Sequence, residues 1–152
     1  MRLTVYSDYS LRLLMYLALR PERLSTIKEI AEAYGISSNH LMKVVHQLGL
    51  AGYVETTRGR NGGMRLGRPA AEIGLGEVIR YTEPDMDIVP CLEPENKTCP
   101  LRRACRLKGA LDRARLAFLG VLDDYTLADL TSTPGPMRSI LGLSSGQAPR
   151  PN

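Results

Sequence analysis

Apolar residues recur every three or four positions in three successive segments near the start of the chain, and this spacing predicts three amphipathic helices. The first covers residues 8–19 and ends before Pro21. The second begins after Ser25 or Thr26, whose hydroxyls can cap a helix, and ends at Gly35, a residue that adopts the left-handed conformation readily. The sequence thus predicts a short turn between the second and third helices.

The third segment completes a helix-turn-helix pattern. Ser37 or Ser38 can cap it, and its apolar face consists of Leu41, Val44, Val45 and Leu48. The opposite face carries side chains that suit base edges and phosphates, namely Ser38, Asn39, His40, Lys43 and Gln47. Many helical hairpins that bind no nucleic acid share this spacing, and a hydrated surface is the alternative for each polar residue. The helices alone therefore leave DNA binding as one hypothesis among several.

A basic hairpin comes directly after the third helix and favours DNA binding. Residues 53–57 alternate as in a strand, the glycine-rich stretch 58–63 turns the chain, and residues 64–66 return. The candidate DNA contacts on this hairpin are Arg58, Arg60, Asn61 and Arg65. A third helix and a basic hairpin together indicate a winged helix, in which the helix enters the major groove and the wing reaches the backbone or the minor groove. The predicted fold is mainly α, with a winged helix-turn-helix domain over residues 1–81.

The second half of the chain contains a longer amphipathic helix. A short helix at 75–81 and a proline-rich loop at 82–106 precede it, and the helix itself is predicted at 107–123. Its apolar stripe consists of Leu107, Leu111, Ala114, Phe118, Val121 and Leu122. We expect this stripe to pair with that of a second subunit, so that 107–130 forms a dimerisation segment, although packing on its own domain is the alternative. Residues 131–152, rich in Pro, Gly and Ser, are expected to form a mostly disordered tail.

Composition and charge narrow the class of protein. The chain has 152 residues with 43% hydrophobic content and a net charge of +4, which suits one globular domain with an appendage. The apolar run 11–19 is too short to span a bilayer and no signal peptide is visible, so no membrane partner and a reducing cytoplasm are expected. No histidine or paired-carboxylate constellation indicates acid–base catalysis, so the chain is not expected to be an enzyme.

Three cysteines supply the candidate chemistry. Cys91, Cys99 and Cys105 are the only cysteines in the chain, and they lie within fifteen residues of the proline-rich loop. A structural zinc site or an iron–sulfur cluster normally takes four protein ligands, and both histidines, His40 and His46, lie on the proposed recognition helix. The fourth ligand is then an oxygen donor, a water, an exogenous molecule or a group from another subunit. Wide spacing of soft ligands favours a cluster, while zinc or reactive thiols remain alternatives.

Four separated motifs resemble one family of bacterial regulators. They are MRLTVYSDYSLRLLMYLA at the start, ISSNHLMKVVHQLGLAGYVETTRGRNGGMRLG, CPLRRACRL and DDYTLADL. Together they resemble the NsrR group of nitric-oxide-sensing repressors, within a winged-helix family that also contains the iron–sulfur regulators IscR and RirA. The resemblance covers about residues 1–130. IscR-like proteins use a histidine three residues after the third cysteine, and Lys108 occupies that position here, so that mode of ligation is excluded.

The resemblance implies a function that the residues alone leave open. It implies a homodimer that binds a palindromic operator and carries a [4Fe-4S] cluster on Cys91, Cys99 and Cys105, with a [2Fe-2S] cluster as the alternative. It implies that Asp8 of the opposite subunit is the fourth ligand, whereas without the resemblance Asp8 is adequately explained as a helix N-cap. Nitric oxide is the implied signal, acting through nitrosylation of the cluster to release promoters of nitric-oxide detoxification genes. An iron-responsive regulator of the RirA type is the alternative.

Overall fold

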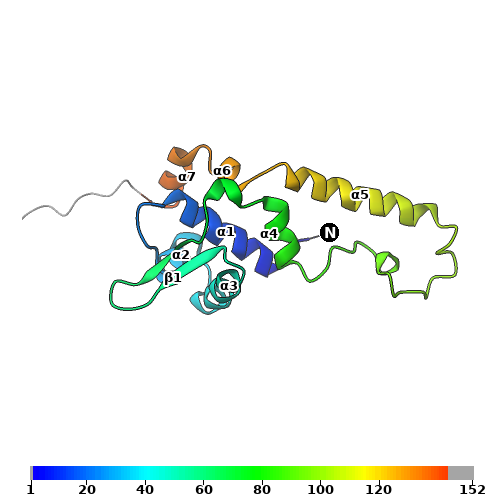
Figure 1. Cartoon of the computed structure of the whole chain (residues 1–152), viewed down its shortest axis with the longest axis horizontal. Coiled ribbons are helices and arrows are strands. Elements are labelled where there is room, and N and C mark those ends of the chain that lie inside the picture. The colour runs from blue at the N-terminus through cyan, green and yellow to red at the C-terminus, as the bar shows by residue number, and fades with distance from the viewer. Residues whose placement is uncertain (1, 144–152) are drawn as a thin grey trace, which may run out of the picture.

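The protein consists of a winged-helix body from which one long helix and one loop project as an arm (Figure 1). The computed structural model describes residues 2–143. In the body, α1 (Val5–Leu19) runs through the centre, and α2 (Ile27–Tyr34) and α3 (Ser38–Leu50) pack against it. The strands β1 (Val54–Thr57) and β2 (Gly63–Leu66) then form an antiparallel hairpin beside α3.

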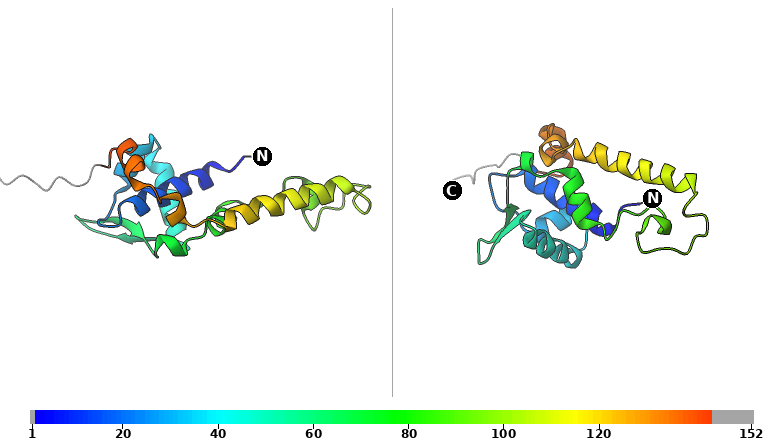
Figure 2. Two further views of the ribbon diagram at one scale, coloured as in Figure 1. Left: turned by 90° about the horizontal axis from the view of Figure 1, so that it is seen from above. Right: turned by 45° about the vertical axis from the view of Figure 1, so that its right-hand side comes forward.

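The remaining elements connect the body to the arm and return to the body. In chain order they are the 3-10 helix η1 (Ala70–Glu72), α4 (Leu75–Thr82), the 3-10 helix η2 (Pro90–Leu92), α5 (Arg106–Asp123), α6 (Leu127–Leu130) and α7 (Pro134–Ile140). Both views in Figure 2 show α5 and the loop before it extending away from the body side by side. No helix within residues 2–143 is long and apolar enough to cross a membrane.

Local signals explain where the first helices begin and end. The Thr4 side chain accepts a hydrogen bond from the Ser7 amide, so α1 begins three residues earlier than predicted and Asp8 lies inside it. The interpretation of Asp8 as an N-cap is therefore wrong. In α2, Thr26 and Glu29 form a capping box, and Gly35 ends the helix with φ of 64°. Ser37 is the N-cap residue of α3. The predicted helix-turn-helix is confirmed.

The hydrophobic core lies between α1 and the helices around it. The largest fully buried side chains include Leu13 and Leu14 of α1, Ile30 of α2, and Leu41 and Leu48 of α3. The apolar stripe predicted for the third helix is thus the face that packs on α1. Its polar positions are left on the opposite, exposed side, which places the candidate DNA contacts on the surface of the body.

The wing is tied to the body at its base. Glu55 pairs with Arg65 across the hairpin, and Thr57 pairs with Gly63 next to the turn. The amide of Ser25 donates to the Met64 carbonyl over 2.9 Å, and the amide of Met64 donates to the Ser25 carbonyl over 2.8 Å. This bridge joins β2 to the segment before α2, so the hairpin extends from the body as a supported ribbon.

The C-terminal segment differs from its prediction. The sequence predicts a disordered tail from residue 131, but residues 131–143 include α7, and Leu143 is buried in the core. Arg138 also donates a hydrogen bond of 2.8 Å to the Leu19 carbonyl at the end of α1. The prediction is therefore wrong for this part of the tail, because Met137 and Leu141 supply apolar contacts to the body. Residues 144–152 of the predicted tail lie outside the described residues.

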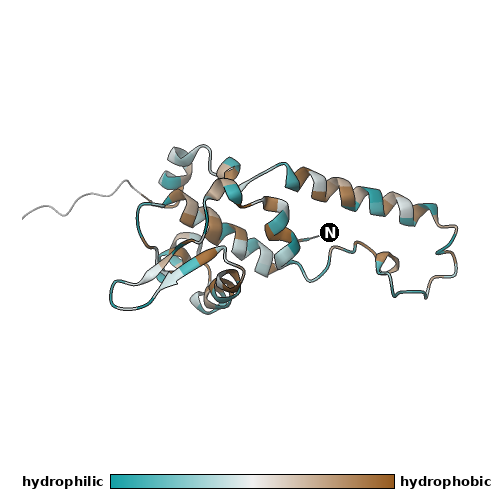
Figure 3. Cartoon of the chain, viewed as in Figure 1, coloured by the Kyte–Doolittle hydropathy of each residue, from teal (hydrophilic) through white to brown (hydrophobic). Residues whose placement is uncertain are grey.

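The long helix ends at Asp123, as predicted, but the segment after it does not continue along the arm. There α6 turns back onto the body through Leu127, which is buried. The predicted apolar stripe also splits between two faces. Phe118 lies with Met86 and Ile88 of the preceding loop, while Leu107 and Val121 remain exposed. Figure 3 shows hydrophobic residues along the arm as well as in the body.

Candidate functional site

The exposed face of α3 carries every predicted recognition residue. Ser38, Asn39, His40, Lys43 and Gln47 are all exposed, and the predicted apolar stripe of the same helix is buried. The structure therefore presents these side chains on one outward surface. Two neighbours that the sequence analysis missed share this surface, Met42 and His46, which line a groove with Lys43 and Gln47. Helical periodicity could have found both, because each lies one turn or less from a predicted contact.

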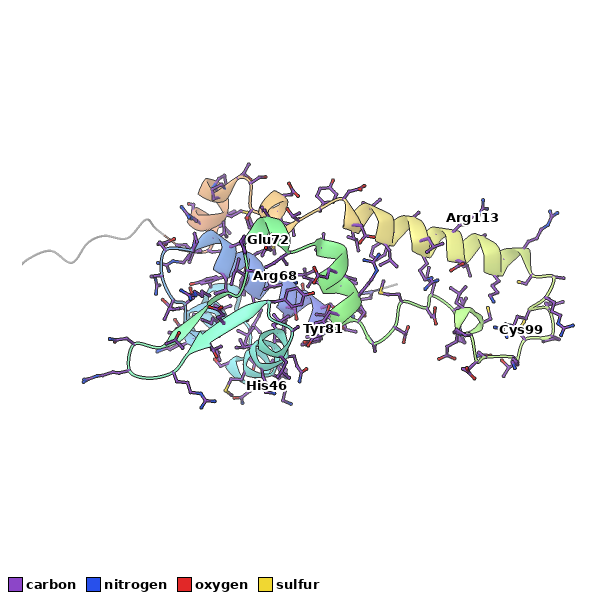
Figure 4. All side chains as sticks on the ribbon, in the orientation of Figure 1. His46, Arg68, Glu72, Tyr81, Cys99 and Arg113 are labelled. Atoms are coloured by element: carbon purple, nitrogen blue, oxygen red, sulfur yellow. The ribbon has the colours of Figure 1, made fainter. Side chains whose placement is uncertain are left out.

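Side chains from α1 and α4 flank the recognition helix. The ring of Tyr9 lies 6.2 Å from the ring of His40, centroid to centroid. Tyr6 of α1 and Tyr81 of α4 line the groove beside Lys43 and His46 (Figure 4 labels Tyr81 and His46). Burial raises the pKa of Tyr6 above its ordinary value, and its hydroxyl, like that of any tyrosine at neutral pH, can donate a hydrogen bond. The surface that can meet DNA is thus wider than α3 alone.

The three arginines of the basic hairpin have different surroundings. Arg58 and Arg60 lie in the turn beyond the strands, are exposed, and form no ion pair within residues 2–143. Asn61 is exposed next to them. Arg65 on β2 pairs with Glu55 at 3.0 Å from its Nε, so its charge is partly compensated. The turn therefore offers the least compensated positive charge of the wing.

Arg68 has a structural role instead. Its guanidinium lies 4.8 Å from the centroid of the Tyr53 ring and donates a hydrogen bond of 2.6 Å to Glu77. The hydrogen bond from Arg68 lowers the pKa of the Glu77 carboxyl, and burial raises the pKa of Tyr53, whose hydroxyl also donates to Glu77. This group joins the base of the wing to α4. Arg68 follows the basic hairpin in the sequence, but its pairing with Glu77 makes its charge less available to DNA than those of Arg58 and Arg60.

The three cysteines all lie on the arm. Cys91 is in η2, Cys99 is in the loop near the far end of the arm (labelled in Figure 4), and Cys105 is the N-cap of α5. All three are free thiols of intermediate exposure, and the Cys105 sulfur accepts a hydrogen bond of 3.4 Å from the Lys108 amide. No group of three metal-ligating side chains is assembled anywhere in residues 2–143. The structure thus places the thiols on one loop without bringing them together.

The chemistry around the thiols suits an anionic group. A hollow beside Cys99 is lined by four cationic side chains, Lys97, Arg102, Arg103 and Lys108. The sulfur of Cys105 faces the amino end of an 18-residue helix, where the backbone dipole favours negative charge. Three thiolates bound to iron and sulfide form an anionic assembly, so the donor set and its surroundings fit such a cluster.

Asp8 lies apart from the cysteines of its own chain. It occupies the first turn of α1 and forms an ion pair of 3.0 Å with Arg12 one turn further on. Its side chain is 44% exposed, so a carboxylate oxygen is accessible to a group from outside the chain. Asp8 could therefore serve as a ligand only for a group held by a second subunit, or after the cysteine loop of its own chain has rearranged.

Comparison with known protein families places this combination of a winged helix and a cysteine loop. Residues 3–133 match the family Rrf2, described as an iron-dependent transcriptional regulator. The chain belongs to the Rrf2 family. This member of the Rrf2 family is therefore a transcriptional regulator with DNA as its partner, and the prediction that it is not an enzyme is confirmed by that membership.

Individual relatives agree with the family. The chain is 52% identical over 144 residues to the HTH-type transcriptional regulator NsrR of Bacillus subtilis, covering 94% of this chain and 99% of that protein. It is 51% identical over 142 residues to the NsrR regulator of Shouchella clausii, covering 93% and 95%. The predicted resemblance to the NsrR group is thus confirmed.

Solved structures support the fold of this Rrf2 protein. CymR, the global cysteine regulator of B. subtilis, matches with a TM-score of 0.70 and 32% identity, covering 87% of this chain and 97% of that chain. IscR of T. potens matches with a TM-score of 0.69 at 23% identity, covering 97% and 94%, which shows the shared fold alone. The predicted fold class, a mainly helical winged helix-turn-helix protein, is confirmed.

Proposed function

We propose that this Rrf2 protein is a homodimeric repressor that binds a palindromic operator and releases it in response to nitric oxide. In this proposal a [4Fe-4S] cluster is held by Cys91, Cys99 and Cys105 of one subunit and Asp8 of the partner subunit. The observation that carries the proposal is that all three thiols lie on one loop of a winged-helix protein, with cations beside Cys99 that an anionic cluster would neutralise. The 52% identity of the chain with an NsrR regulator supports nitric oxide as the signal.

An exposed seam on α5 supports the dimer. Residues at alternating spacings of three and four are exposed and apolar along the whole helix, the pattern of a coiled-coil contact: Leu107, Ala110, Ala114, Ala117 and Val121. The small side chains in the middle of this seam allow two helices to approach closely. Pairing of two such helices would extend each arm beside the other subunit, where Asp8 of that subunit is accessible.

The cluster supplies iron atoms with which nitric oxide reacts. Charged residues of the chain would make the conformation of the cysteine loop depend on whether the cluster is bound. Without a shared anionic group, the cations beside Cys99 lie near one another with no acidic partner among the lining residues. Asp8 also has a competing partner, because the Arg12 guanidinium already holds its carboxylate at 3.0 Å. Loss of the shared ligand set would free both groups and change the relative placement of the two wings, which must read half-sites about 34 Å apart.

The test of the cluster begins with anaerobic purification. The protein should be brown, with iron and sulfide present, and Cys91→Ala, Cys99→Ala and Cys105→Ala should each abolish the colour. The matched control is Leu101→Ala, which removes an exposed side chain from the same loop. A colourless native protein that contains zinc would refute the cluster.

The test of the signal compares two treatments of the cluster-loaded protein. Operator binding is followed by fluorescence anisotropy during titration with nitric oxide and, separately, with an iron chelator. The proposal expects release at about stoichiometric nitric oxide while the chelator acts slowly. Release by mild chelation without a response to nitric oxide would favour the second candidate, an iron-responsive regulator. The description of the family as iron-dependent supports that candidate.

The test of Asp8 as a ligand measures the spectrum of the cluster in a variant that keeps its fold. Asp8→Ala should keep the thermal stability within a few degrees, because the side chain is 44% exposed and its ion pair with Arg12 is a surface contact. It should change the visible and EPR spectra of the cluster and the rate of its reaction with nitric oxide. The matched control is Asp124→Ala, an exposed aspartate after α5. An unchanged spectrum and response would refute Asp8 as a ligand.

A further inference from the structure

The helix α4 has side chains that contact four separate parts of the protein. Its residues and its C-cap reach the base of the wing, the arm, the recognition helix and the start of α1. The contacts are Glu77 to Tyr53 and Arg68, Arg80 to Asp123, Tyr81 to Gln47, and Glu83 to Thr4 and Ser7. The cysteine loop begins directly after this helix. Tyr81 thus connects the residues before that loop to the recognition helix, and Glu83 connects them to the start of α1.

Tyr81 holds the carboxyl-terminal turn of the recognition helix. Its hydroxyl donates a hydrogen bond of 2.9 Å to the main-chain carbonyl of Gln47. That carbonyl also accepts the helical hydrogen bond of 3.1 Å from the Ala51 amide, so both of its lone pairs are used. The Tyr81 ring packs edge-on against Tyr53, with centroids 5.7 Å apart, which fixes its direction. Because Gln47 is a predicted DNA contact, Tyr81 acts on the backbone that carries a recognition side chain.

Glu83 holds the first turn of α1. One of its carboxylate oxygens accepts hydrogen bonds from the Thr4 amide over 2.8 Å, from the Thr4 hydroxyl over 3.1 Å and from the Ser7 hydroxyl. Ser7 is fully buried, so this carboxylate satisfies a polar group that has no access to water. The same turn of α1 carries Asp8, and the next residue is Tyr9, whose ring lies beside His40. Glu83 therefore links the start of the cysteine loop to the opposite end of the recognition helix.

We infer that Tyr81 and Glu83 are positioning residues that couple the state of the cysteine loop to the placement of the recognition helix. The two residues are separated by Thr82 alone, and Cys91 follows Glu83 by eight positions. A displacement of the loop thus acts on the last turn of α4 and on the first turn of α1 together, and through them on both ends of α3. This inference rests on the proposed function, since it requires a loop whose conformation depends on its cluster.

The hydrogen bond of Tyr81 can be separated from the packing of its ring by substitution. The Tyr81 ring is partly buried and packs against Tyr53, whereas its hydroxyl lies outside that packing. Its hydroxyl donates to the recognition helix and forms no other hydrogen bond in the described chain. Replacement by phenylalanine keeps the ring against Tyr53 and removes only the hydrogen bond. The variant Tyr81→Phe therefore isolates the coupling from the packing.

The experiment measures operator affinity twice for each variant, in the cluster-loaded protein under anaerobic conditions and after the iron has been removed with a chelator. The ratio of the two dissociation constants reports the coupling between loop and helix. For Tyr81→Phe we expect this ratio to shrink about two- to tenfold relative to the unmodified protein, the range for loss of one neutral hydrogen bond, with an unchanged cluster spectrum. The matched control is Tyr125→Phe, an exposed tyrosine after α5, which should leave the ratio unchanged.

A second variant keeps the inference testable if removal of the Glu83 carboxyl disturbs folding. Glu83→Gln retains an acceptor oxygen for Thr4 and Ser7 and should keep most of the ratio, whereas Glu83→Ala should reduce it at least as much as Tyr81→Phe. Hydrogen exchange gives an independent measure, since amides at the end of α3 should exchange faster in Tyr81→Phe than in the unmodified protein.

The outcomes separate the inference from the function on which it rests. If the unmodified protein binds the operator equally well with and without its cluster, the proposed function is refuted and the coupling is refuted with it. If the unmodified protein shows a difference and both Tyr81→Phe and Glu83→Ala preserve the full ratio, the proposed function stands and the positioning role is wrong.

Discussion

Removal of one wing charge should change how DNA binding depends on salt. Arg60 lies in the turn of the wing, is exposed, and has no ion-pair partner in the described part of the chain. The proposed dimer carries two wings, so Arg60→Ala should remove two charges from its complex with DNA. Each phosphate contact contributes about 0.9 to the slope of log affinity against log salt, so the slope should become shallower by about 1.8.

The slope sets the size of the effect that an assay must resolve. From about 50 to about 200 mM salt, a fourfold range, a slope difference of about 1.8 means that the unmodified protein loses about twelvefold more affinity than Arg60→Ala. Fluorescence anisotropy with a labelled operator, repeated at four or five salt concentrations, measures this directly. The loss should be similar on an operator and on unrelated DNA, because a phosphate contact carries no sequence information.

Two variants bracket this prediction. Arg65→Ala should change the slope less, because the Arg65 guanidinium already pairs with Glu55, 3.0 Å from its Nε, and is less available to a phosphate. Arg113→Ala removes an exposed charge from α5, on the arm instead of the wing (Figure 4), and should leave the slope unchanged while the dimer persists in size-exclusion chromatography. A slope for Arg60→Ala equal to that of the unmodified protein would refute the assignment of the turn as a DNA contact.

Three further predictions concern the body and its joint with the arm. Gly76→Ala should lower operator affinity although alanine favours a helix, since a Cβ there would overlap the Asp123 carboxylate and displace its ion pair with Arg80; affinity that matches the unmodified protein would contradict this. Leu48→Ala removes a fully buried side chain and should cost about 2–5 kcal/mol of unfolding free energy in urea titrations, so a loss below about 1 kcal/mol would show that the site is not core. The hydrogen bond from Arg68 lowers the pKa of Glu77, so this carboxylate stabilises the fold above its ordinary pKa, and the stabilisation is lost as the pH falls through the lowered value. Glu77→Gln should therefore make the melting temperature fall less steeply between pH 6 and pH 3.

The sequence is a good guide where periodicity and local chemistry act alone. The cap at Thr26, the left-handed Gly35 and the hairpin of the wing are decided by neighbouring residues, and each is found within one residue of its predicted place. The exposed and buried faces of α3 follow from the same periodicity. These elements also hold the candidate DNA contacts, so the exposure of those side chains could be predicted, whereas Tyr6 and Tyr81 beside the helix could not.

Tertiary contacts decide the features that the sequence does not reveal. Residues 131–143 have the proline and glycine content of a tail, but Met137 and Leu141 pack on the body and stabilise α7. By charge alone Arg68 is one more DNA-binding cation, whereas in the fold it contacts Glu77 and Tyr53. Neither partner is close in sequence, so composition could not reveal the contact. The ligand set is a different case, since Asp8 as a ligand still depends on the resemblance to other regulators.

The charge of the cysteine loop explains why a cluster could act as a switch in this fold. Residues 83–95 carry five acidic side chains and no basic ones, whereas residues 97–108 carry five basic side chains and no acidic ones. Only Asp87 of the acidic half forms an ion pair in the described chain, and its partner is Arg115 on α5. The basic half therefore has no internal compensation around Cys99. An anionic cluster at the three thiols would supply that compensation, and its loss would leave like charges in a small hollow. In the proposed function the loop would then have two conformations that differ in electrostatic energy, and the contacts of Tyr81 and Glu83 offer a short path from that loop to the proposed recognition helix.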